Sequence, residues 1–329
     1  MKTASMKLLI AIISCILCQS GAVSASGEAE AGNNPDITLR TGLQINDPSI
    51  TLHPNQVNGY DSDTDYTPNS LSHATFELIY KGLGFSFSNK ISDDATNNLI
   101  YGRTESRDFT LFFCGVAFSI DAYYFRRKGV YITEDYTPTV ENPYPQRPDI
   151  EIITTGMRFS YLISDFKTGF SFESAVKRTS RARNVQAGFL LMVSPFYFSI
   201  DGDHNLIPPD KAHLYPGIAS LDKCEFYVLS AMPGFAVNVP LWVFYVTSSL
   251  NAGPAATVYR FMVNSEPEWH TRWRRTWAYD IVYTLGFGID ADFIFTGLTF
   301  TIDTGEFWGR ELTIGYTNVF LELFAGIRI

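Results

Sequence analysis

Hydrophobic and polar positions alternate with a period of two along much of the chain. In the last segment the aliphatic positions share one face: Leu321, Leu323, Ala325, Ile327 and Ile329. The opposite face holds Phe320, Glu322, Phe324, Gly326 and Arg328. Between Asp292 and Asp303, the face with Ile294, Thr296, Leu298, Phe300 and Ile302 opposes one with Gly297, Thr299, Thr301 and Asp303. An apolar face opposite a small or polar face is typical of a strand in a transmembrane barrel. A half-buried strand of a soluble sandwich alternates equally well.

The same pattern predicts about 14 extended runs, or about 12 if the weak ones merge. They are Asp36–Gln44, Leu71–Tyr80, Gly82–Ser88, Asp108–Phe113, Val116–Tyr124, Ile153–Tyr161, Thr168–Ala175, Asn184–Met192, Phe196–Ile200, Cys224–Ala236, Leu241–Leu250, Trp273–Gly288, Phe293–Ile302 and Glu311–Ile329. Ala255–Phe261 is a further strand or an extension above the membrane. Tight turns are expected near Lys81, Gly115, Ser164, Ser194, Pro240 and Asp290, and long loops at 45–70, 125–150, 201–222 and 251–272.

Three features favour the barrel over the sandwich. Most runs are about 8–11 residues long, enough to cross a bilayer when tilted. Aromatic residues crowd the strand ends, as in Tyr123-Tyr124-Phe125. Short turns alternate with long polar loops, which is the usual asymmetry between periplasmic and external ends. We therefore expect an all-β transmembrane antiparallel barrel of about 12–14 strands, with the tight turns facing the periplasm.

The N-terminus indicates export. Lys2 and Lys7 precede an apolar run, Leu8–Leu17, which is too short to span a bilayer as a helix. Val23-Ser24-Ala25 offers a cleavage site before Ser26. The expected organisation is a signal peptide at 1–25, a flexible lead-in at 26–35 and one barrel domain at 36–329, in the outer membrane of a Gram-negative bacterium. A lipoprotein site at Cys15 is the weaker alternative.

Composition narrows the choice of class. Hydrophobic residues make up 46% of the chain and charged residues 18%, so a disordered chain is excluded. The net charge of −9 argues against a nucleic-acid binder, which needs a basic face. Only Cys114 and Cys224 lie beyond the signal peptide, and two cysteines so far apart form neither a disulfide framework nor a metal motif.

Several short segments occur in a recognisable order: Tyr66-Thr67-Pro68-Asn69, Glu77–Gly84, Arg181-Ala182-Arg183, Gln186–Leu191 and Asn251-Ala252-Gly253-Pro254. In this order they resemble a family of predicted outer-membrane barrels of Bacteroides-type bacteria, domain of unknown function 4421. The resemblance runs from about Asp36 to Ile329. It implies a location and a fold, and it supplies no catalytic residues.

Candidate chemistry is sparse, and no cofactor or metal site is predicted. His204 and His213 share a loop with three aspartates, where a divalent ion could bind. Asp61–Asp65 resembles the start of a calcium loop but lacks its glycine and distal glutamate. For both segments we expect a solvated loop and no ion site. His73 is the only histidine on a predicted strand, and Ser72 beside it points to the other face. With no GxSxG elbow, we expect no enzyme.

The densest basic cluster contains Arg272, Arg274 and Arg275, which are candidates for contacts with lipopolysaccharide phosphates. Interfacial snorkelling without a specific ligand is the alternative, and Lys177-Arg178 with Arg181 and Arg183 forms a second cluster. The leading function is a barrel of structural, surface-binding or transport-supporting role, with outer-membrane lipids as partners. Inward Phe320, Glu322 and Phe324 would partly fill its lumen. The alternatives are a lipid-modifying enzyme in the barrel, such as a lipase or lipid A deacylase, and a soluble periplasmic β protein.

Overall fold

The computed structural model describes residues 36–55, 63–69, 71–91, 95–164, 166, 168–263 and 273–329. The predicted signal peptide and lead-in, 1–35, lie outside the described residues. No helix in the described ranges is long and apolar enough to cross a membrane. The strands are β1 (Ile37–Pro54), β2 (Thr64–Thr67), β3 (Leu71–Tyr80), β4 (Leu83–Lys90), β5 (Glu105–Cys114), β6 (Phe118–Thr133), β7 (Gln146–Ser164), β8 (Gln186–Asp201), β9 (Leu221–Leu241), β10 (Phe244–Val263), β11 (Arg274–Asp290), β12 (Ile294–Trp308) and β13 (Leu312–Arg328).

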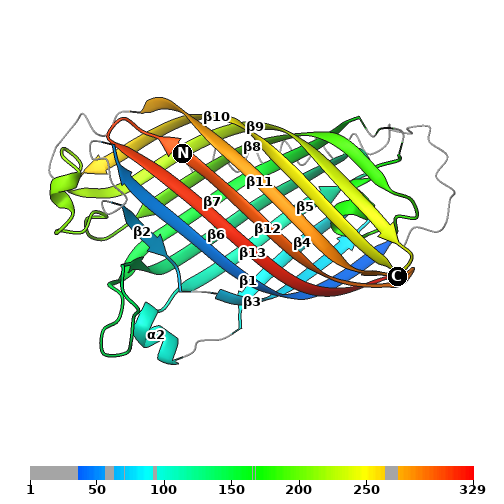
Figure 1. The fold of residues 1–329 in the computed structure, drawn as a ribbon, viewed down its shortest axis with the longest axis horizontal. Helices are drawn as coiled ribbons and strands as arrows, with labels where there is room; N and C mark the ends of the chain where they lie inside the picture. The colour runs from blue at the N-terminus through cyan, green and yellow to red at the C-terminus, as the bar shows by residue number, and fades with distance from the viewer. Residues whose placement is uncertain are drawn as a thin grey trace. The chain divides into compact units, whose positions relative to one another are not determined.

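These strands form one closed antiparallel barrel (Figure 1). Apart from β2, strands that follow one another along the chain pair with each other, and β13 closes the ring by pairing with β1 from Thr38↔Arg328 to Pro54↔Leu312. Of the thirteen strands in the described ranges, twelve close the ring and the short β2 sits between β1 and β6. The prediction of an all-β barrel with about 12–14 strands is confirmed.

The ring changes its strand number along the axis. On β1, the residues up to Asn46 pair with β3, whereas Ile50–Leu52 pair with β2. On β6, Lys128 pairs with β5 and Tyr131 pairs with β2. The single strand β2 therefore replaces β3, β4 and β5 at one end, and ten strands surround the lumen there instead of twelve.

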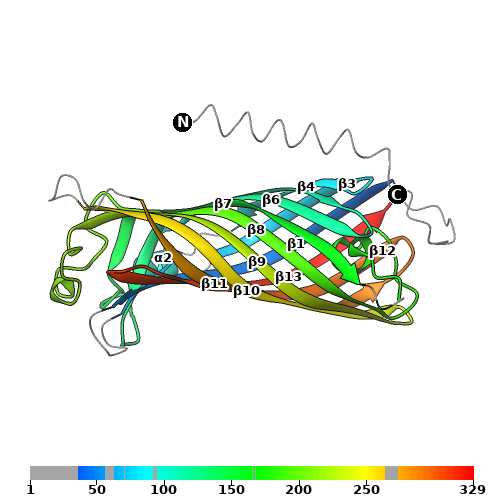
Figure 2. The ribbon, with the colours of Figure 1, turned by 90° about the horizontal axis from the view of Figure 1, so that it is seen from above.

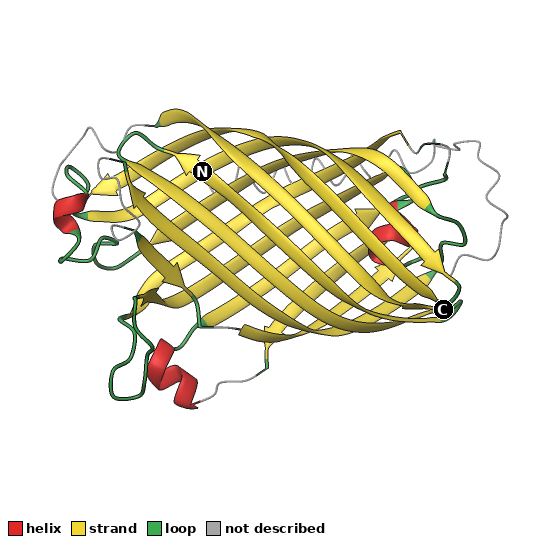
Figure 3. Cartoon of the chain, viewed as in Figure 1, coloured by secondary structure: helices red, strands yellow, loops and turns green. Residues whose placement is uncertain are grey.

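Most short connections lie at one end of the barrel and most long ones at the other, as predicted. The exceptions are the long connection from β7 to β8, which lies at the short-turn end, and the short connection from β12 to β13, which lies at the other end. At one end of the barrel the first and last strands meet, where Ile37 N donates to Ile329 O at 3.1 Å. The turns near Lys81, Gly115, Trp242 and Asp292 lie at the same end. The other end carries most of the long connections, including α2 (Ala95–Tyr101), which the sequence analysis missed, and η3 (Ala212–Leu214) (Figure 3). The view from above in Figure 2 shows the same separation.

Several predicted elements differ from the structure. The tight turn expected near Ser164 is the start of a long connection from β7 to β8, and the loops expected at 45–70, 125–150 and 251–272 begin within β1, β6 and β10. Thr168–Ala175 is not a strand, because residues 168–185 form an irregular segment with a π-helix, η2 (Glu173–Lys177). Ser194-Pro195 is not a turn but the middle of β8. Proline fits there because the β7–β8 ladder lapses between Gly156↔Phe196 and Phe159↔Val193, so its missing N–H leaves no broken pair. The doubtful strand Ala255–Phe261 is the outer part of β10.

The inside and outside of the wall exchange character along the axis. On β1, Leu43 and Ile45 point outward and are exposed, whereas Ile50 and Leu52 point into the lumen and are buried. We call the part near Ile37 and Ile329 the belt zone and the part near most of the long connections the core zone. In the core zone, β8 and β9 also direct large apolar residues inward: Phe196, Phe198, Ile200, Cys224, Phe226 and Val228. The belt zone is therefore apolar outside and the core zone apolar inside.

Candidate functional site

Apolar side chains fill most of the lumen of the core zone. Its inward side chains form one large apolar cluster that includes Phe226, Phe307 and Ile314. The long connection 202–220 closes the top, because its residues Leu206, Ile207, Tyr215 and Ile218 are fully buried in the same cluster. Two tyrosines secure this cap: the Tyr215 hydroxyl donates to Leu52 O at 2.7 Å, and the Tyr66 hydroxyl donates to Leu206 O.

Below this apolar cluster lies a layer of buried charge. Arg127 forms a two-pronged ion pair with Asp108, in which Nη2 donates to Oδ2 at 2.7 Å. Arg158 pairs with Asp303. Next to them, Asp280 accepts hydrogen bonds from the Tyr316 hydroxyl at 2.7 Å and the Ser230 hydroxyl at 2.9 Å. Each charge thus has a partner, as burial in a protein interior requires.

A small cavity of about 50 Å³ lies beside this layer. Aromatic residues such as Phe125 and Phe320 line one part of it, and Asn46, Arg158 and Asp303 line another. Asn46 Oδ1 and Asp303 Oδ1 are buried without a hydrogen-bond partner. A space of this size and polarity holds a few water molecules and is too small for a drug-sized ligand.

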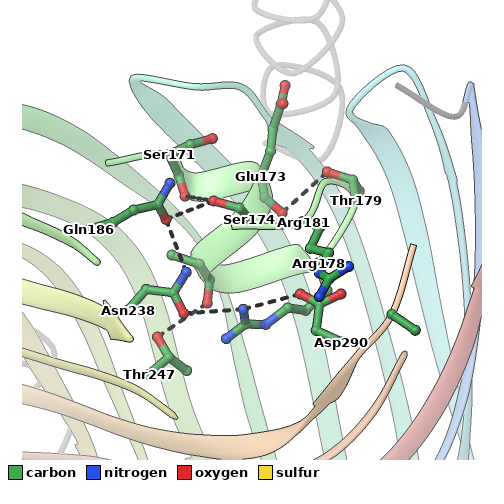
Figure 4. Close-up of polar contacts among 12 residues, drawn as sticks. Ser171, Glu173, Ser174, Arg178, Thr179, Arg181, Gln186, Asn238, Thr247 and Asp290 are labelled. Atoms are coloured by element: carbon green, nitrogen blue, oxygen red, sulfur yellow. Dashed lines mark hydrogen bonds and ion pairs between the residues drawn. The ribbon is translucent and has the colours of Figure 1, made fainter. Parts of the chain in front are cut away.

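The belt zone is closed from the other end by residues 168–185, which we call the plug (Figure 4). Phe170, Phe172 and Ala175 of the plug pack with Cys114, Leu190 and Ala236 of the wall in a small apolar cluster. All six side chains are buried. The aromatic residues of the plug thus pack against an apolar patch on the inner face of the wall.

Polar contacts fix the plug to the wall. Gln186 at the start of β8 accepts from Ser174 Oγ at 2.9 Å and from Asn238 Nδ2 at 3.0 Å. Arg178 donates to Asn238 Oδ1 at 3.2 Å, and its guanidinium lies 3.7 Å from the Asp290 carboxylate (Figure 4).

Two further cations of this segment bind carboxylates. Lys177 Nζ lies 3.7 Å from Glu77 of β3 and 3.5 Å from Asp121 of β6. Arg181 donates to Asp292 Oδ1 at 2.8 Å in the β11–β12 turn, and this hydrogen bond holds the pKa of Asp292 below its ordinary value. The second basic cluster of the sequence is therefore an anchor of the plug and not a free basic patch.

The predicted phosphate contacts are only partly described. Arg272 lies outside the described residues. Arg274 Nη1 donates to Glu311 Oε2 at 2.6 Å, so a lipid phosphate there would compete with a carboxylate. Arg275 is exposed on the outward face of β11, between Trp273 and Trp277. Of the two described arginines, Arg275 is the one open to lipid.

The histidines do not form a metal centre in the described ranges, where no three His, Cys, Asp or Glu side chains converge. His213 contacts the backbone of Asp210, and Asp201 is paired with Lys223. His270 and Asp61 lie outside the described residues. His53, expected in a loop, is on β1 and contacts Asp63 at 2.9 Å.

His73 has a serine partner that the sequence analysis missed. Its Nε2 lies 2.9 Å from Ser106 Oγ on β5, which is separated from β3 by the single strand β4. Both side chains point into the lumen and are buried, at 0% and 9% exposure. Ser72, as expected, faces away. Only the pairing of β3 with β4 and of β4 with β5 brings Ser106 to His73, and no local pattern signals it.

A family model described as domain of unknown function (DUF4421) matches residues 33–328. The chain belongs to this family. The resemblance found in the short segments is thus confirmed over the whole barrel domain, and the DUF4421 domain is a closed antiparallel barrel.

No curated protein matches the DUF4421 chain by sequence. Among solved structures, it is similar to the outer membrane protease OmpT from Escherichia coli, with 6% identity, a TM-score of 0.42 and coverage of 92% of this chain and 100% of that one. The translocator domain of the autotransporter NalP from Neisseria meningitidis has 10% identity, a TM-score of 0.35 and coverage of 100% and 97%. The Pseudomonas putida toluene transporter TodX has 8% identity, a TM-score of 0.32 and coverage of 94% of this chain and 95% of that one. These values relate none of the three activities to this chain.

Proposed function

We propose that the chain is an outer-membrane barrel with a closed lumen and a structural or surface-binding role. The belt zone supports membrane insertion. Its outward side chains are large, apolar and exposed all round the ring, among them Leu43, Phe189, Leu250, Phe287 and Leu323. A soluble protein does not leave so much contiguous apolar surface in water, whereas a lipid-facing barrel wall requires it.

The proposal of a closed lumen rests on one observation: the lumen is filled in both zones. The core zone is sealed by an apolar cluster capped by residues 202–220, and the belt zone is occupied by the plug. An ion crossing the core zone would have to enter a packed apolar interior, which costs far more than thermal energy supplies.

Planar-bilayer recording tests this proposal. The purified barrel, checked for folding by its heat-modifiable gel mobility, should give no conductance above the bilayer leak, while an open porin reconstituted in parallel conducts. Steady ohmic steps from the folded barrel would reject the closed lumen and support a transport role.

Lipid binding at the outer rim is part of this proposal. Arg275, together with Arg272 and Arg274, would bind lipopolysaccharide phosphates through charge-assisted hydrogen bonds. Changing all three to Gln should lower the lipopolysaccharide that co-purifies with the folded barrel. Arg310→Gln, an exposed arginine between β12 and β13, serves as the control and should lower it little. Equal losses in both variants would reject a specific site.

A hydrolase is the second candidate, and the contact between Ser106 and His73 is what favours it. A serine beside a histidine is the core of a nucleophilic site. We rank it second because both side chains are buried in the wall, where a hydrogen bond is also the ordinary way to satisfy a histidine. Turnover of lipid esters that disappears in Ser106→Ala would reverse this ranking.

A further inference from the structure

The wall around the plug is built to hold something other than its own side chains. A ring of twelve strands is wider than the eight-stranded size that inward side chains fill unaided. Several inward positions of β9, β10 and β11 beside the plug are small, namely Ala236, Thr247, Ser249 and Gly286, while Asn238 and Tyr245 of the same wall contact Arg178 of the plug. Without residues 168–185, this end of the lumen would be an open chamber.

Polar contacts, more than apolar packing, hold the plug in place. No strand ladder joins it to the wall, its apolar cluster with the wall contains only three plug residues, and its remaining contacts are hydrogen bonds and ion pairs such as those of Lys177 and Arg178. Its single helical turn is of the π type, which is rare and concentrates at functional sites. Arg178 holds a left-handed conformation, with φ of 57°, that a non-glycine residue rarely adopts. Segments held by few apolar contacts are the ones that open first.

The chamber attracts cations. Lys177 faces Glu77 and Asp121, and Arg178 faces Asp290. Two wall arginines bind the same group of carboxylates: Arg40 contacts Glu77 and Glu322, and Arg328 contacts Asp290 at 2.7 Å. With Lys177 and Arg178 withdrawn, four carboxylates would face two guanidinium groups, a net charge of −2. In a low-dielectric wall, such an excess favours another cation.

We propose that residues 168–185 are a displaceable plug, and that the anionic chamber they occupy accepts a cationic solute in their place. The proposal rests on the closed barrel proposed above, because the core zone stays sealed while the plug moves. The chamber then opens only at the end that carries Ile37 and Ile329, and it acts as a binding vestibule instead of a pore.

Two of the four cysteines, Cys114 and Cys224, test this on the intact chain. Cys114 lies in the cluster beneath the plug and Cys224 lies in the core zone, and both are 0% exposed. Folded barrel is treated with a membrane-impermeant maleimide, and peptide mass mapping follows each thiol separately. Cys114 should react faster than Cys224. Lys177→Gln with Arg178→Gln should raise the Cys114 rate about tenfold or more, because the opening equilibrium governs access. The Cys224 rate should not change.

A second pair of variants guards against misfolding. Glu77→Gln with Asp121→Asn leaves the plug intact and removes the carboxylates that face Lys177, so it should also speed the labelling of Cys114. Each variant is first shown to keep its heat-modifiable mobility. If neither pair accelerates Cys114 in folded barrel, the plug is fixed and the proposal is wrong.

Spermidine tests the cationic solute. At constant ionic strength set with NaCl, millimolar spermidine should accelerate Cys114 labelling in the unaltered barrel, because a trivalent amine competes with Lys177 and Arg178. Acceleration by the variants without any effect of spermidine would reject the cationic ligand. Rapid labelling of Cys224 would instead show that the core zone is open, which refutes the closed lumen and not the plug.

Discussion

Single residues in the lumen are governed by the cost of burying charge. Arg127 and Asp108 form the most buried ion pair of the charged layer, with side-chain exposures of 5% and 7%. Asp108→Asn would leave an uncompensated guanidinium inside the wall. We expect a loss of about 3–5 kcal/mol in the free energy of unfolding, measured by urea titration in detergent micelles. Changing both residues to Leu should restore most of it, because an apolar pair needs no partner. Equal losses in the single and double variants would contradict this account.

Elements are held by a few contacts that link distant parts of the chain. The cap at 202–220 depends on the hydroxyl of Tyr215, which reaches Leu52 O in the core zone. Tyr215→Phe removes this buried hydrogen bond and should cost about 0.5–1.5 kcal/mol, seen as faster proteolysis within the cap. The matched control is Tyr136→Phe, whose hydroxyl donates to Pro143 O in an exposed loop. It should have little effect, and a similar effect of both changes would show that the cap is not anchored there.

At the same scale, β8 shows where local signals fail. Ser194-Pro195 has the composition of a turn, and proline is normally absent from a central strand. The strand continues because the β7 ladder lapses opposite Pro195. The plug is the converse case: Thr168–Ala175 alternates like a strand, yet the aromatic residues at its start pack into the lumen.

The whole molecule combines two environments in one set of strands. In the belt zone Leu323 of β13 faces outward and is exposed, and Thr317 of the same face lies at the start of the core zone. Leu323→Lys should destabilise the barrel in lipid vesicles by about 2–4 kcal/mol, whereas Thr317→Lys should cost at most about 1 kcal/mol. Unfolding by urea in vesicles measures both. Similar values for the two variants would mean that the belt zone does not face lipid.

The period-two pattern was sufficient to predict which residues of the last two strands face inward and which face outward. Leu323 and Ile327 are exposed, and Phe320, Glu322 and Phe324 face the lumen as predicted. The alternation of short and long connections likewise predicted which ends share a side. These features follow from the sequence alone because they depend on neighbours two residues apart or on connection length.

Tertiary structure decided the rest. Periodicity shows which residues share a face, but it does not show what covers that face, so the exchange of polarity between the belt zone and the core zone was not foreseen. The contact of His73 with Ser106, the closure of the core zone by residues 202–220 and the entry of Lys177 and Arg178 into the lumen all join positions far apart in the chain. Such contacts form only once the ring has closed and set which side chains meet across it.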